Sequence, residues 1–436
     1  MENYDNKTQV IVVGAGPAGI ACAITIARAG KEVVLIERGK FAGSKNMFGG
    51  AIYAKPTREI FPNFEESAPL ERKTTEHKYA ILGEDDGTVI SYKKKNNDEN
   101  VSYSVIRPKF DRWMASEAEK EGVILVEETV VKDLIIQDGY VKGVRTEIEN
   151  YYADIVVLAD GVNSLLAFKS GLRNRINPED VALSVKEVIK LPEEIINARF
   201  NLKSDEGCIY EIFGGSMLGI LGLGFMYTNK NSVSIGLGVS LKELKDKRLK
   251  PYELLDKLKE HPQIAPLLKD GELLEYSAHL IPEGGYKKVP KLVGNGVMIC
   301  GDAAMLVNNM HWEGTNLAMI SGKLAGETAV IALGRDDFSE NTLSHYQEKL
   351  EKSFIMKDLK TYKDLMPILE NKAEDFLGYY PKKINAFFDM FTTVDSVPKR
   401  ENYWKFIKSL FKERKISGLF KDFCAVIKLL WSILVK

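Results

Sequence analysis

The residues best suited to chemistry in this 436-residue chain lie in a glycine-rich turn near its start. Four apolar residues at 10–13 predict a buried strand, and a helix expected over 20–29 follows the turn. A second apolar run, at 33–36, ends at an acidic residue. Strand, glycine turn, helix, strand and acid are the arrangement that binds a dinucleotide. The residues expected at this site are Gly14, Gly16, Pro17, Ala18, Gly19, Glu37 and Arg38.

At each of the three glycine positions of the turn, a larger residue would interfere with the geometry. Gly14 permits a sharp turn, Gly16 lets the backbone approach a pyrophosphate, and Gly19 lets helix and strand pack closely. The N-terminus of the helix offers free N–H groups and the positive end of its dipole to the phosphates. An ordinary glycine turn of another α/β protein is the alternative, and it leaves Glu37 unexplained. We therefore predict dinucleotide binding.

Two later stretches place further polar residues at the ends of expected strands. The strand over 153–158 runs into Asp160-Gly161, and the strand over 297–300 runs into Gly301-Asp302. A helix expected over 317–333 comes after the second stretch. The residues at the start of that helix are Gly314, Thr315 and Asn316.

The composition argues against several classes of protein. The net charge of −1 gives no overall field that would attract nucleic acid. The four cysteines are scattered without a C-x-x-C, which argues against a disulfide framework, a metal site or an iron–sulfur cluster held by this chain alone. Their reduced state would fit a cytoplasmic compartment. The N-terminus lacks a signal-peptide pattern, and no uninterrupted apolar run reaches about 20 residues.

The order of the three stretches resembles the flavoprotein superfamily with the para-hydroxybenzoate hydroxylase fold, which includes the geranylgeranyl reductases. The resemblance implies that the first motif holds the ADP half of FAD and that Asp302 binds near the ribityl chain or the pyrophosphate. It also implies that the helix start at 314–316 faces the N1/O2 side of the flavin, where a helix N-terminus stabilises the negative charge of the reduced ring. Arg107 matches an arginine that contacts FAD, and we assign Val131 to the cofactor site as well.

The loop from Gly43 to Gly50 resembles more narrowly the FixC family, relatives of electron-transfer-flavoprotein:quinone oxidoreductase. The loop residues expected at the cofactor are Ser44, Lys45, Asn46, Gly49 and Gly50. The resemblance implies that electrons pass from the alpha and beta subunits of an electron-transfer flavoprotein, through a ferredoxin-like iron–sulfur protein, to menaquinone or ubiquinone. Electron bifurcation occurs in some members. The fused oxidoreductases carry several cluster cysteines near the C-terminus, where this chain has only Cys424, and this favours FixC.

We predict an α/β fold with a Rossmann-like FAD-binding domain, an inserted antiparallel β-sheet substrate domain and a helical C-terminal region. The FAD-binding domain is assigned to 1–78, 105–180 and 290–338, the β-rich quinone or substrate domain to 79–104 and 181–289, and the helical region to 339–436. Alternating residues over 79–105 predict a hairpin with its tip at Lys93 to Asn100.

Two residues beside the expected flavin are candidates for proton chemistry. His311 has a side chain suited to shuttle a proton to a quinone, although a structural histidine is the alternative. For Glu313 the two alternatives are proton transfer and capping of the helix. Trp312 stands where the family pattern has arginine, and its ring suits either a quinone pocket or packing in the core.

The end of the chain is basic and amphipathic. Residues 399–436 hold ten Lys or Arg against three acids, an excess of seven, and the apolar residues of 416–434 fall on one helical stripe. Such a helix can lie in a bilayer interface or pack on the protein's own core. We predict membrane contact and a peripheral location at the inner face of the cell membrane. Alternative functions are a geranylgeranyl reductase-like enzyme acting on polyprenyl lipids, an aromatic hydroxylase, or a flavin-bearing subunit of a larger complex with no substrate of its own.

Overall fold

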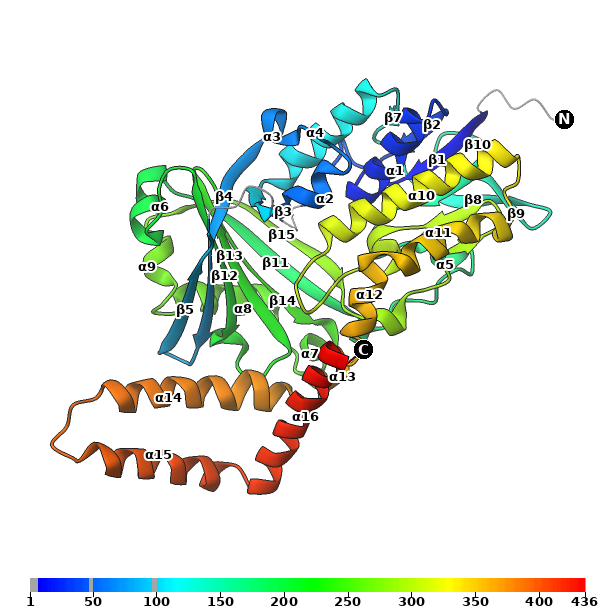
Figure 1. Ribbon diagram of the computed structural model, residues 1–436. Coiled ribbons are helices and arrows are strands. Elements are labelled where there is room, and N and C mark those ends of the chain that lie inside the picture. The colour runs from blue at the N-terminus through cyan, green and yellow to red at the C-terminus, as the bar shows by residue number, and fades with distance from the viewer. Residues whose placement is uncertain (1–6, 47–49, 96–99, 436) are drawn as a thin grey trace. The chain divides into compact units, whose positions relative to one another are not determined.

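The computed structural model describes residues 7–46, 50–95 and 100–435 (Figure 1). The chain divides into two compact units. Unit 1 comprises Met1–Glu71, Asn97–Val181 and His279–Lys363, and unit 2 comprises Arg72–Asn96, Ala182–Ala278 and Asp364–Lys436. The domain boundaries drawn from the sequence stay a prediction.

Unit 1 is built on a sheet with the strand order β16-β17-β10-β1-β2-β7, to which β8 and β9 are joined through β10. The central strands are parallel, with Val13 opposite both Ile36 and Leu158. Continuous apolar runs form these strands because both faces of a parallel sheet are covered. The carboxyl ends of β1, β2, β10 and β17 therefore share one edge, as the predicted Rossmann-like fold requires. The strand bounds are β1 Lys7–Val13, β2 Val33–Ile36, β7 Ile124–Val126, β8 Val131–Gln137, β9 Tyr140–Thr146, β10 Asn150–Leu158, β16 Val293–Gly294 and β17 Val297–Ile299. Two further strands, β3 Ala51–Tyr53 and β6 Ser102–Val105, pair in antiparallel fashion.

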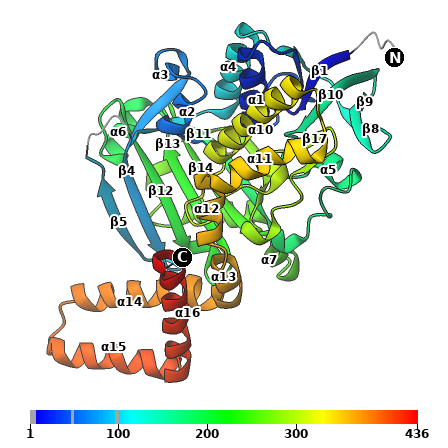
Figure 2. The same ribbon diagram turned by 45° about the vertical axis from the view of Figure 1, so that its right-hand side comes forward.

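Helices α1 and α10 lie side by side in unit 1, as Figures 1 and 2 both show. Their approach depends on glycine, because a Cβ atom added at Gly322 of α10 would lie 2.0 Å from the carbonyl oxygen of Ala18 in α1. α10 is long and apolar enough to cross a membrane, but 61% of it is buried, as expected of a core helix. The helix bounds in unit 1 are α1 Pro17–Arg28, α2 Ala54–Arg58, α3 Phe64–Ser67, α4 Arg107–Lys120, α5 Leu165–Lys169, α10 Thr315–Arg335, α11 Glu340–Lys352 and α12 Phe354–Thr361, with short 3₁₀ turns η2 Pro178–Asp180, η4 Tyr286–Lys288 and η5 Gly301–Ala304.

Unit 2 contains a largely antiparallel sheet in the order β15-β11-β14-β13-β12-β4, with β5 paired to β4. Within the described residues, β4 and β12 are parallel neighbours. Helices α6 and α8 supply apolar side chains such as Phe200 and Leu258 to its core. The bounds in unit 2 are β4 Leu70–Leu82, β5 Gly87–Lys93, β11 Val181–Lys190, β12 Glu206–Gly214, β13 Gly222–Thr228, β14 Ser232–Ser240, β15 Glu272–Pro282, α6 Glu193–Phe200, η3 Gly215–Met217, α7 Leu241–Asp246, α8 Pro251–Glu260 and α9 Ala265–Leu268.

The hairpin of unit 2 turns earlier than the sequence predicted. β4 and β5 are connected by residues 83–86, where the N–H of Gly83 donates to the carbonyl of Asp86. The alternation of residues hid a run of turn formers, Gly-Glu-Asp-Asp-Gly, at 83–87. The predicted tip at Lys93 to Asn100 is wrong in its described part, since β5 continues to Lys93, and residues 96–99 lie outside the described residues.

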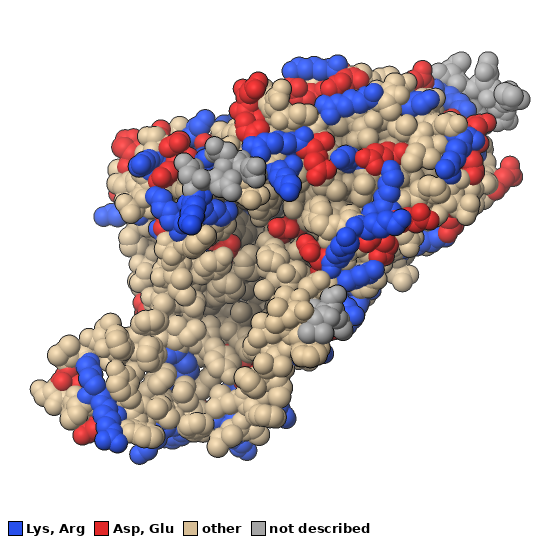
Figure 3. All heavy atoms as spheres, viewed as in Figure 1, with Lys and Arg blue, Asp and Glu red and all other residues tan. Residues whose placement is uncertain are grey.

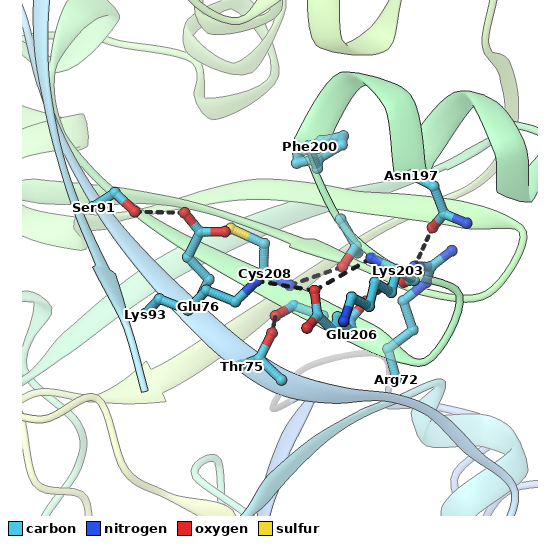
Figure 4. A network of polar contacts seen from close by, with 12 residues as sticks. Arg72, Thr75, Glu76, Ser91, Lys93, Asn197, Phe200, Lys203, Glu206 and Cys208 are labelled. Atoms are coloured by element: carbon cyan, nitrogen blue, oxygen red, sulfur yellow. Dashed lines mark hydrogen bonds and ion pairs between the residues drawn. The ribbon is translucent and has the colours of Figure 1, made fainter. Parts of the chain in front are cut away.

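A buried arginine of β4 links three neighbouring segments at one end of this sheet. Arg72 of β4 is 1% exposed and donates to Asn197 Oδ1 at 2.7 Å, to the carbonyl of Glu206 at 2.9 Å and to the carbonyl of Asn229 at 2.8 Å. Figure 4 shows Arg72 beside Asn197, Lys203 and Glu206. Because every one of these partners is a protein oxygen, the role of Arg72 is structural.

The chain ends in a group of helices that also belongs to unit 2. Their bounds are α13 Leu365–Ala373, the π-helical turn η6 Glu374–Tyr379, α14 Tyr380–Thr392, α15 Lys399–Glu413 and α16 Ile416–Val435. Asp422 of α16 is 2% exposed and accepts hydrogen bonds from Lys372, Tyr380 and Arg414 at 2.7–2.9 Å. This polar cluster joins α13, α14 and the end of α15 to the inner face of α16.

Candidate functional site

The first part of the site is the turn between β1 and α1. Gly14 has φ +101°, and a Cβ atom there would lie 2.4 Å from the carbonyl oxygen of Ala159; a Cβ at Gly19 would lie 1.9 Å from the carbonyl oxygen of Gly14. At Gly16 the position of a Cβ has no atom within 4 Å, so there is room in front of the helix. Pro17 begins α1, and Gly16 supplies no side-chain cap. The first turn thus keeps the free N–H groups and positive dipole end that a pyrophosphate needs.

Glu37 lies at the carboxyl end of β2, beside the glycine turn. Its Oε2 accepts from the N–H of Ala15 at 2.9 Å, and its Oε1 accepts from the N–H of Gly39 at 2.7 Å. These two bonds fix the carboxylate at the position where dinucleotide folds bind ribose hydroxyls. Glu37 therefore lies beside the glycine turn, and its predicted contact with ribose stays a prediction.

The second and third stretches meet because β10 and β17 are parallel neighbours. Asp160 accepts from Ser164 Oγ at 2.7 Å, and burial raises its pKa against the effects of that bond and of Arg173. Asp302 lies in the turn after β17, where burial raises its pKa to about 6 against the charge of Arg107. Both residues are half-buried at the carboxyl ends of these neighbouring strands.

Arg173 ties these two stretches together, and sequence reasoning missed it. Its Nη1 donates to the carbonyl of Ala303 at 2.9 Å, and its Nη2 donates to the carbonyls of Val162 at 2.7 Å and Asn163 at 2.8 Å. The side chain is buried. No motif surrounds Arg173 in the sequence, so only the fold reveals its position.

The start of α4 adds a buried cation. Arg107 pairs with Asp111 through two hydrogen bonds, and its Nη1 reaches Thr315 Oγ1 at the start of α10, 3.4 Å away. The predicted loop packs against the same helix, since a Cβ at Gly43 (φ +86°) would lie 2.6 Å from the Cβ of Asp111. Arg107, Gly43 and Thr315 are thus brought together from three separate segments.

The other predicted loop residues have varied surroundings. Ser44 Oγ is buried without a hydrogen-bond partner in the described part of the chain, Lys45 is exposed, and Gly50 accepts from the N–H of Val105. Asn46 donates its N–H to the carbonyl of Gly43, and Val131 begins β8. The predicted residue Gly49 lies outside the described residues.

The start of α10 presents unsatisfied polar atoms. Asn308 Nδ2, Asn309 Oδ1 and Asn316 Oδ1 are buried, and none has a hydrogen-bond partner among the described residues. Buried polar groups are normally paired, so such atoms mark a place where a polar ligand completes the bonding. Gly314 gives α10 no side-chain cap, which leaves its positive end available.

The two candidate proton-transfer residues lie in the tight loop before α10. Asn308 and Glu313 bond to each other through both backbone groups, at 2.9 and 3.2 Å. His311 Nε2 lies 3.0 Å from the hydroxyl of Tyr362, and burial raises the pKa of Glu313 against a hydrogen bond from Asn316 and the charge of His311. Trp312, at φ +51°, is 43% exposed, so packing in the core does not account for it.

The sequence did not predict that His279 lies near the expected cofactor residues. Burial, with the positive charges of Arg107 and Arg38, lowers its pKa to about 4, so the ring is neutral at neutral pH. The sequence offered no partner spacing for this histidine. The fold nevertheless brings it close to two of the predicted cofactor residues.

Three family models match the chain, and together they span most of it. Residues 9–181 match FAD dependent oxidoreductase, residues 182–281 match the ubiquinone-binding region of ETF-QO, and residues 365–430 match the ETF-QO/FixC family C-terminal domain. The glycine cradle, the fixed acid and the orphaned asparagine atoms fit FAD. The protein is therefore an FAD-dependent oxidoreductase, as the sequence predicted.

Curated relatives narrow this class. Protein FixC of Bradyrhizobium diazoefficiens is 43% identical over 424 residues, covering 96% of this chain and 98% of the relative. Protein FixC of Escherichia coli is 41% identical over 395 residues, covering 89% and 91%. The chain belongs to the FixC family.

Solved structures show the same fold at low identity. A geranylgeranyl bacteriochlorophyll reductase-like protein from Thermoplasma acidophilum has a TM-score of 0.72 at 21% identity, covering 94% of this chain and 98% of that one. A myxobacterial chondrochloren halogenase has a TM-score of 0.66 at 15% identity, covering 94% and 91%. These neighbours support the predicted fold class.

When bound, FAD supplies the redox chemistry. The chain's own residues do the rest: the turn at Gly14–Gly19 and Glu37 would hold the ADP half, and Asp302 with the segment fixed by Arg173 would hold the middle of the cofactor. The start of α10 would place N–H groups and a positive dipole end at the flavin ring, where they favour the reduced, negatively charged form. These assignments are proposals for the individual residues.

Proposed function

We propose that this protein passes electrons from an electron-transfer flavoprotein, through a ferredoxin-like iron–sulfur protein, to a membrane quinone. The observation that carries the proposal is the match of residues 182–281 to a ubiquinone-binding region in the same chain as an FAD-binding region. A flavin takes two electrons and releases them singly or together, so it is suited to stand between one-electron carriers and a quinone.

The cysteines support a separate iron–sulfur partner. Cys22, Cys208 and Cys300 are buried, and Cys424 is exposed. Cluster ligation takes several cysteine thiolates at one place. Among the described residues there is no group of three metal-binding side chains. In this proposal the cluster that delivers electrons therefore belongs to another protein.

An electron-transfer assay with one component left out at a time tests the route. The holoprotein is mixed anaerobically with reduced alpha and beta subunits of the electron-transfer flavoprotein, with and without the ferredoxin-like protein, and flavin absorbance is followed. We expect bleaching only when both are present, and recovery when menaquinone or ubiquinone is added. Bleaching without the ferredoxin-like protein would contradict its place in the route, and rapid bleaching by NADPH alone would favour a hydroxylase.

We further propose that α15 and α16 place the protein at the inner face of the cell membrane. Large apolar side chains of α16 are exposed to solvent rather than packed on the core: Ile416 71%, Phe420 65%, Phe423 61%, Trp431 62% and Leu434 80%. On the face seen in Figure 3, uncharged residues cover much of these helices, with lysine and arginine among them. Exposed apolar residues on one side of a helix that also carries cations suit a bilayer interface, where a quinone is dissolved.

Paired substitutions separate the apolar from the electrostatic contribution. Replacing Phe423 and Trp431 by Gln removes apolar area without changing the charge. Replacing Lys421 and Lys428 by Gln removes two positive charges and keeps the large apolar side chains. We expect the first pair to abolish flotation with anionic liposomes and the second to weaken it in a salt-dependent way. Asp422 stays in place in both variants, so the helices keep their polar cluster. Unchanged flotation of the first pair would contradict membrane binding by α16.

A further inference from the structure

The face of the unit 2 sheet that points away from its apolar core carries a row of polar and aromatic side chains. The core residues Val185 and Met226 alternate along β11 and β13 with Lys186 and Phe225, so Lys186 and Phe225 lie on the opposite face. Directly opposed residues of neighbouring strands share a face. The outer row, as we call it, therefore runs across five neighbouring strands through Tyr79 of β4, Glu211 of β12, Phe225 of β13, Gly236 of β14 and Lys186 of β11.

At one end of the outer row, Lys186 and Tyr227 form a buried hydrogen-bonded pair. Their exposed fractions are 3% and 6%, and Nζ of Lys186 donates to the hydroxyl oxygen of Tyr227 at 3.0 Å. Because this oxygen accepts the bond, the O–H of Tyr227 is left to donate in turn, and no hydrogen bond among the described residues uses it. Buried donors of this kind are normally paired. The pair thus offers a donor to an oxygen atom that the described residues do not supply.

Near the other end of the outer row, His77 and Glu211 lie on adjacent strands with Nδ1 and Oε1 3.5 Å apart. The second polar atom of each side chain, Nε2 of His77 and Oε2 of Glu211, is buried and has no hydrogen-bond partner in the described part of the chain. A proton on Nδ1 faces the carboxylate, which leaves Nε2 of the neutral ring as an acceptor. This end therefore presents two acceptors that lack a donor.

Between the two ends, the ring of Phe225 lies close against β14. A Cβ atom added at Gly236 would lie 2.5 Å from Cζ of Phe225, so this approach requires glycine. The ring is stacked with that of Tyr227, with centroids 6.0 Å apart and planes inclined by 14°. Phe225 is only half-buried, so part of its ring is exposed. A flat aromatic surface thus lies between a donor end and an acceptor end.

We infer that the outer row binds the head group of a quinone, with the quinone ring against Phe225. A quinone is a planar ring with oxygen atoms on opposite edges, and one carbonyl oxygen accepts from the O–H of Tyr227. In the quinol, the hydroxyl on the opposite edge donates to Nε2 of His77 or Oε2 of Glu211. Residues 182–281, which match a ubiquinone-binding region, include all of these side chains except that of His77. The inference rests on the proposed function for the class of ligand and adds the residues that contact the head group.

Equilibrium binding tests the inference without an electron donor. The oxidised holoprotein is dialysed anaerobically against a short-tailed ubiquinone or its quinol, and the bound fraction is measured. Tyr227→Phe removes the O–H and keeps the ring, and we expect it to raise the dissociation constant of the quinone about tenfold. Glu211→Gln replaces an acceptor by an amide, and we expect it to raise the dissociation constant of the quinol about tenfold and that of the quinone less than about twofold.

Tyr210→Phe is the matched control. Tyr210 is also 6% exposed and also lies beside a lysine, with Nζ of Lys78 5.2 Å from its ring centroid, but it belongs to the apolar core on the opposite face of the sheet. This variant should keep the wild-type dissociation constants. The ratio of flavin absorbance to protein should be unchanged in all three variants.

Photolabelling gives an answer that does not depend on the folding of a variant. Irradiation of the wild-type holoprotein with an azido-ubiquinone, followed by peptide mapping, should place the label on β12 or β13. Wild-type quinone affinity in Tyr227→Phe, an equal loss in Tyr210→Phe, or a label confined to other segments would overturn the inference while leaving quinone binding itself intact. A wild-type protein that binds no ubiquinone would contradict the proposed function as well, whereas failure of the donor proteins to reduce the flavin would leave these binding measurements unaffected.

Discussion

The guanidinium group of Arg107 and the carboxylate of Asp111 form a buried two-point ion pair, with Nε 2.7 Å from Oδ1 and Nη2 2.8 Å from Oδ2. The two side chains are 3% and 0% exposed and lie one turn apart on α4. The pair leaves Nη1 of Arg107 directed at Thr315, the first residue of α10. Asp111 therefore holds the cation of Arg107 at the start of the helix proposed to face the flavin.

Replacing Asp111 by Asn should weaken FAD binding. The substitution keeps the volume but leaves the charge of Arg107 buried and without its anion, which typically costs about 3–5 kcal/mol. We expect a lower free energy of unfolding in urea and an FAD dissociation constant raised at least tenfold. Lys120→Gln on the same helix breaks only an exposed pair with Glu117 and should change stability by less than about 1 kcal/mol. Equal behaviour of the two variants would argue against a special role for Asp111.

Replacing Gly322 by Ala should force α1 and α10 apart. The added methyl group would lie 2.0 Å from the carbonyl oxygen of Ala18, so one helix must shift, and overpacking of this kind costs about 1–3 kcal/mol. Gly334→Ala on the same helix meets no atom within 4 Å and should stabilise the protein by up to about 1 kcal/mol through helix propensity. Thermal unfolding of the two apoproteins measures both effects. A Gly322→Ala protein as stable as the wild type would show that the helices are less tightly packed.

Replacing Arg173 by Met should loosen the link between the strand ends of β10 and β17. The substitution removes three hydrogen bonds to the carbonyls of Ala303, Val162 and Asn163. We expect faster release of FAD, measured by the rise in flavin fluorescence on dilution. Arg173→Lys keeps the charge but lacks the forked geometry, so it should fall between Met and the wild type. Wild-type release rates in both variants would contradict the positioning role.

The stability of the protein should depend on pH through Glu283. Its folded-state pKa of about 8 lies above the ordinary value of 4.5, so the folded state binds more protons than the unfolded state between these values. The stabilisation is complete below about pH 4.5 and is lost as the pH rises to about 8, with a slope of up to about 1.4 kcal/mol per pH unit for this group. In Glu283→Gln this component of the slope should vanish. Urea unfolding across that range compares the two proteins, and identical slopes would contradict the prediction.

The sequence predicted the parts of the fold and site that depend on local patterns. The turn at Gly14–Gly19, the acid Glu37 and the strand ends at Asp160 and Asp302 can be found because turn geometry and strand burial restrict residue types over a few positions. The FAD cofactor, the fold class and the FixC family are confirmed by the comparisons. The roles of individual residues remain predictions.

Contacts between residues far apart in the chain could not be predicted from the sequence, because no local pattern encodes them. Arg173 lies 130 positions from Ala303, and His279 is far along the chain from Arg107, yet folding brings each pair together. The raised pKa of Glu283 could not be predicted either, since an isolated glutamate after a strand normally faces water. The alternation over 79–105 predicts strands that continue past the turn residues at 83–87, and it therefore places the turn of the hairpin too late.

The most direct test of the central claim is reoxidation of the reduced holoprotein by a quinone. The FAD of the purified protein is reduced with one equivalent of dithionite and mixed anaerobically with menaquinone in liposomes, while the oxidised flavin absorbance and the quinol formed are measured. We predict full recovery of the absorbance, with one quinol per FAD and a rate that saturates with quinone. A protein whose flavin stays reduced in the presence of both menaquinone and ubiquinone would contradict it.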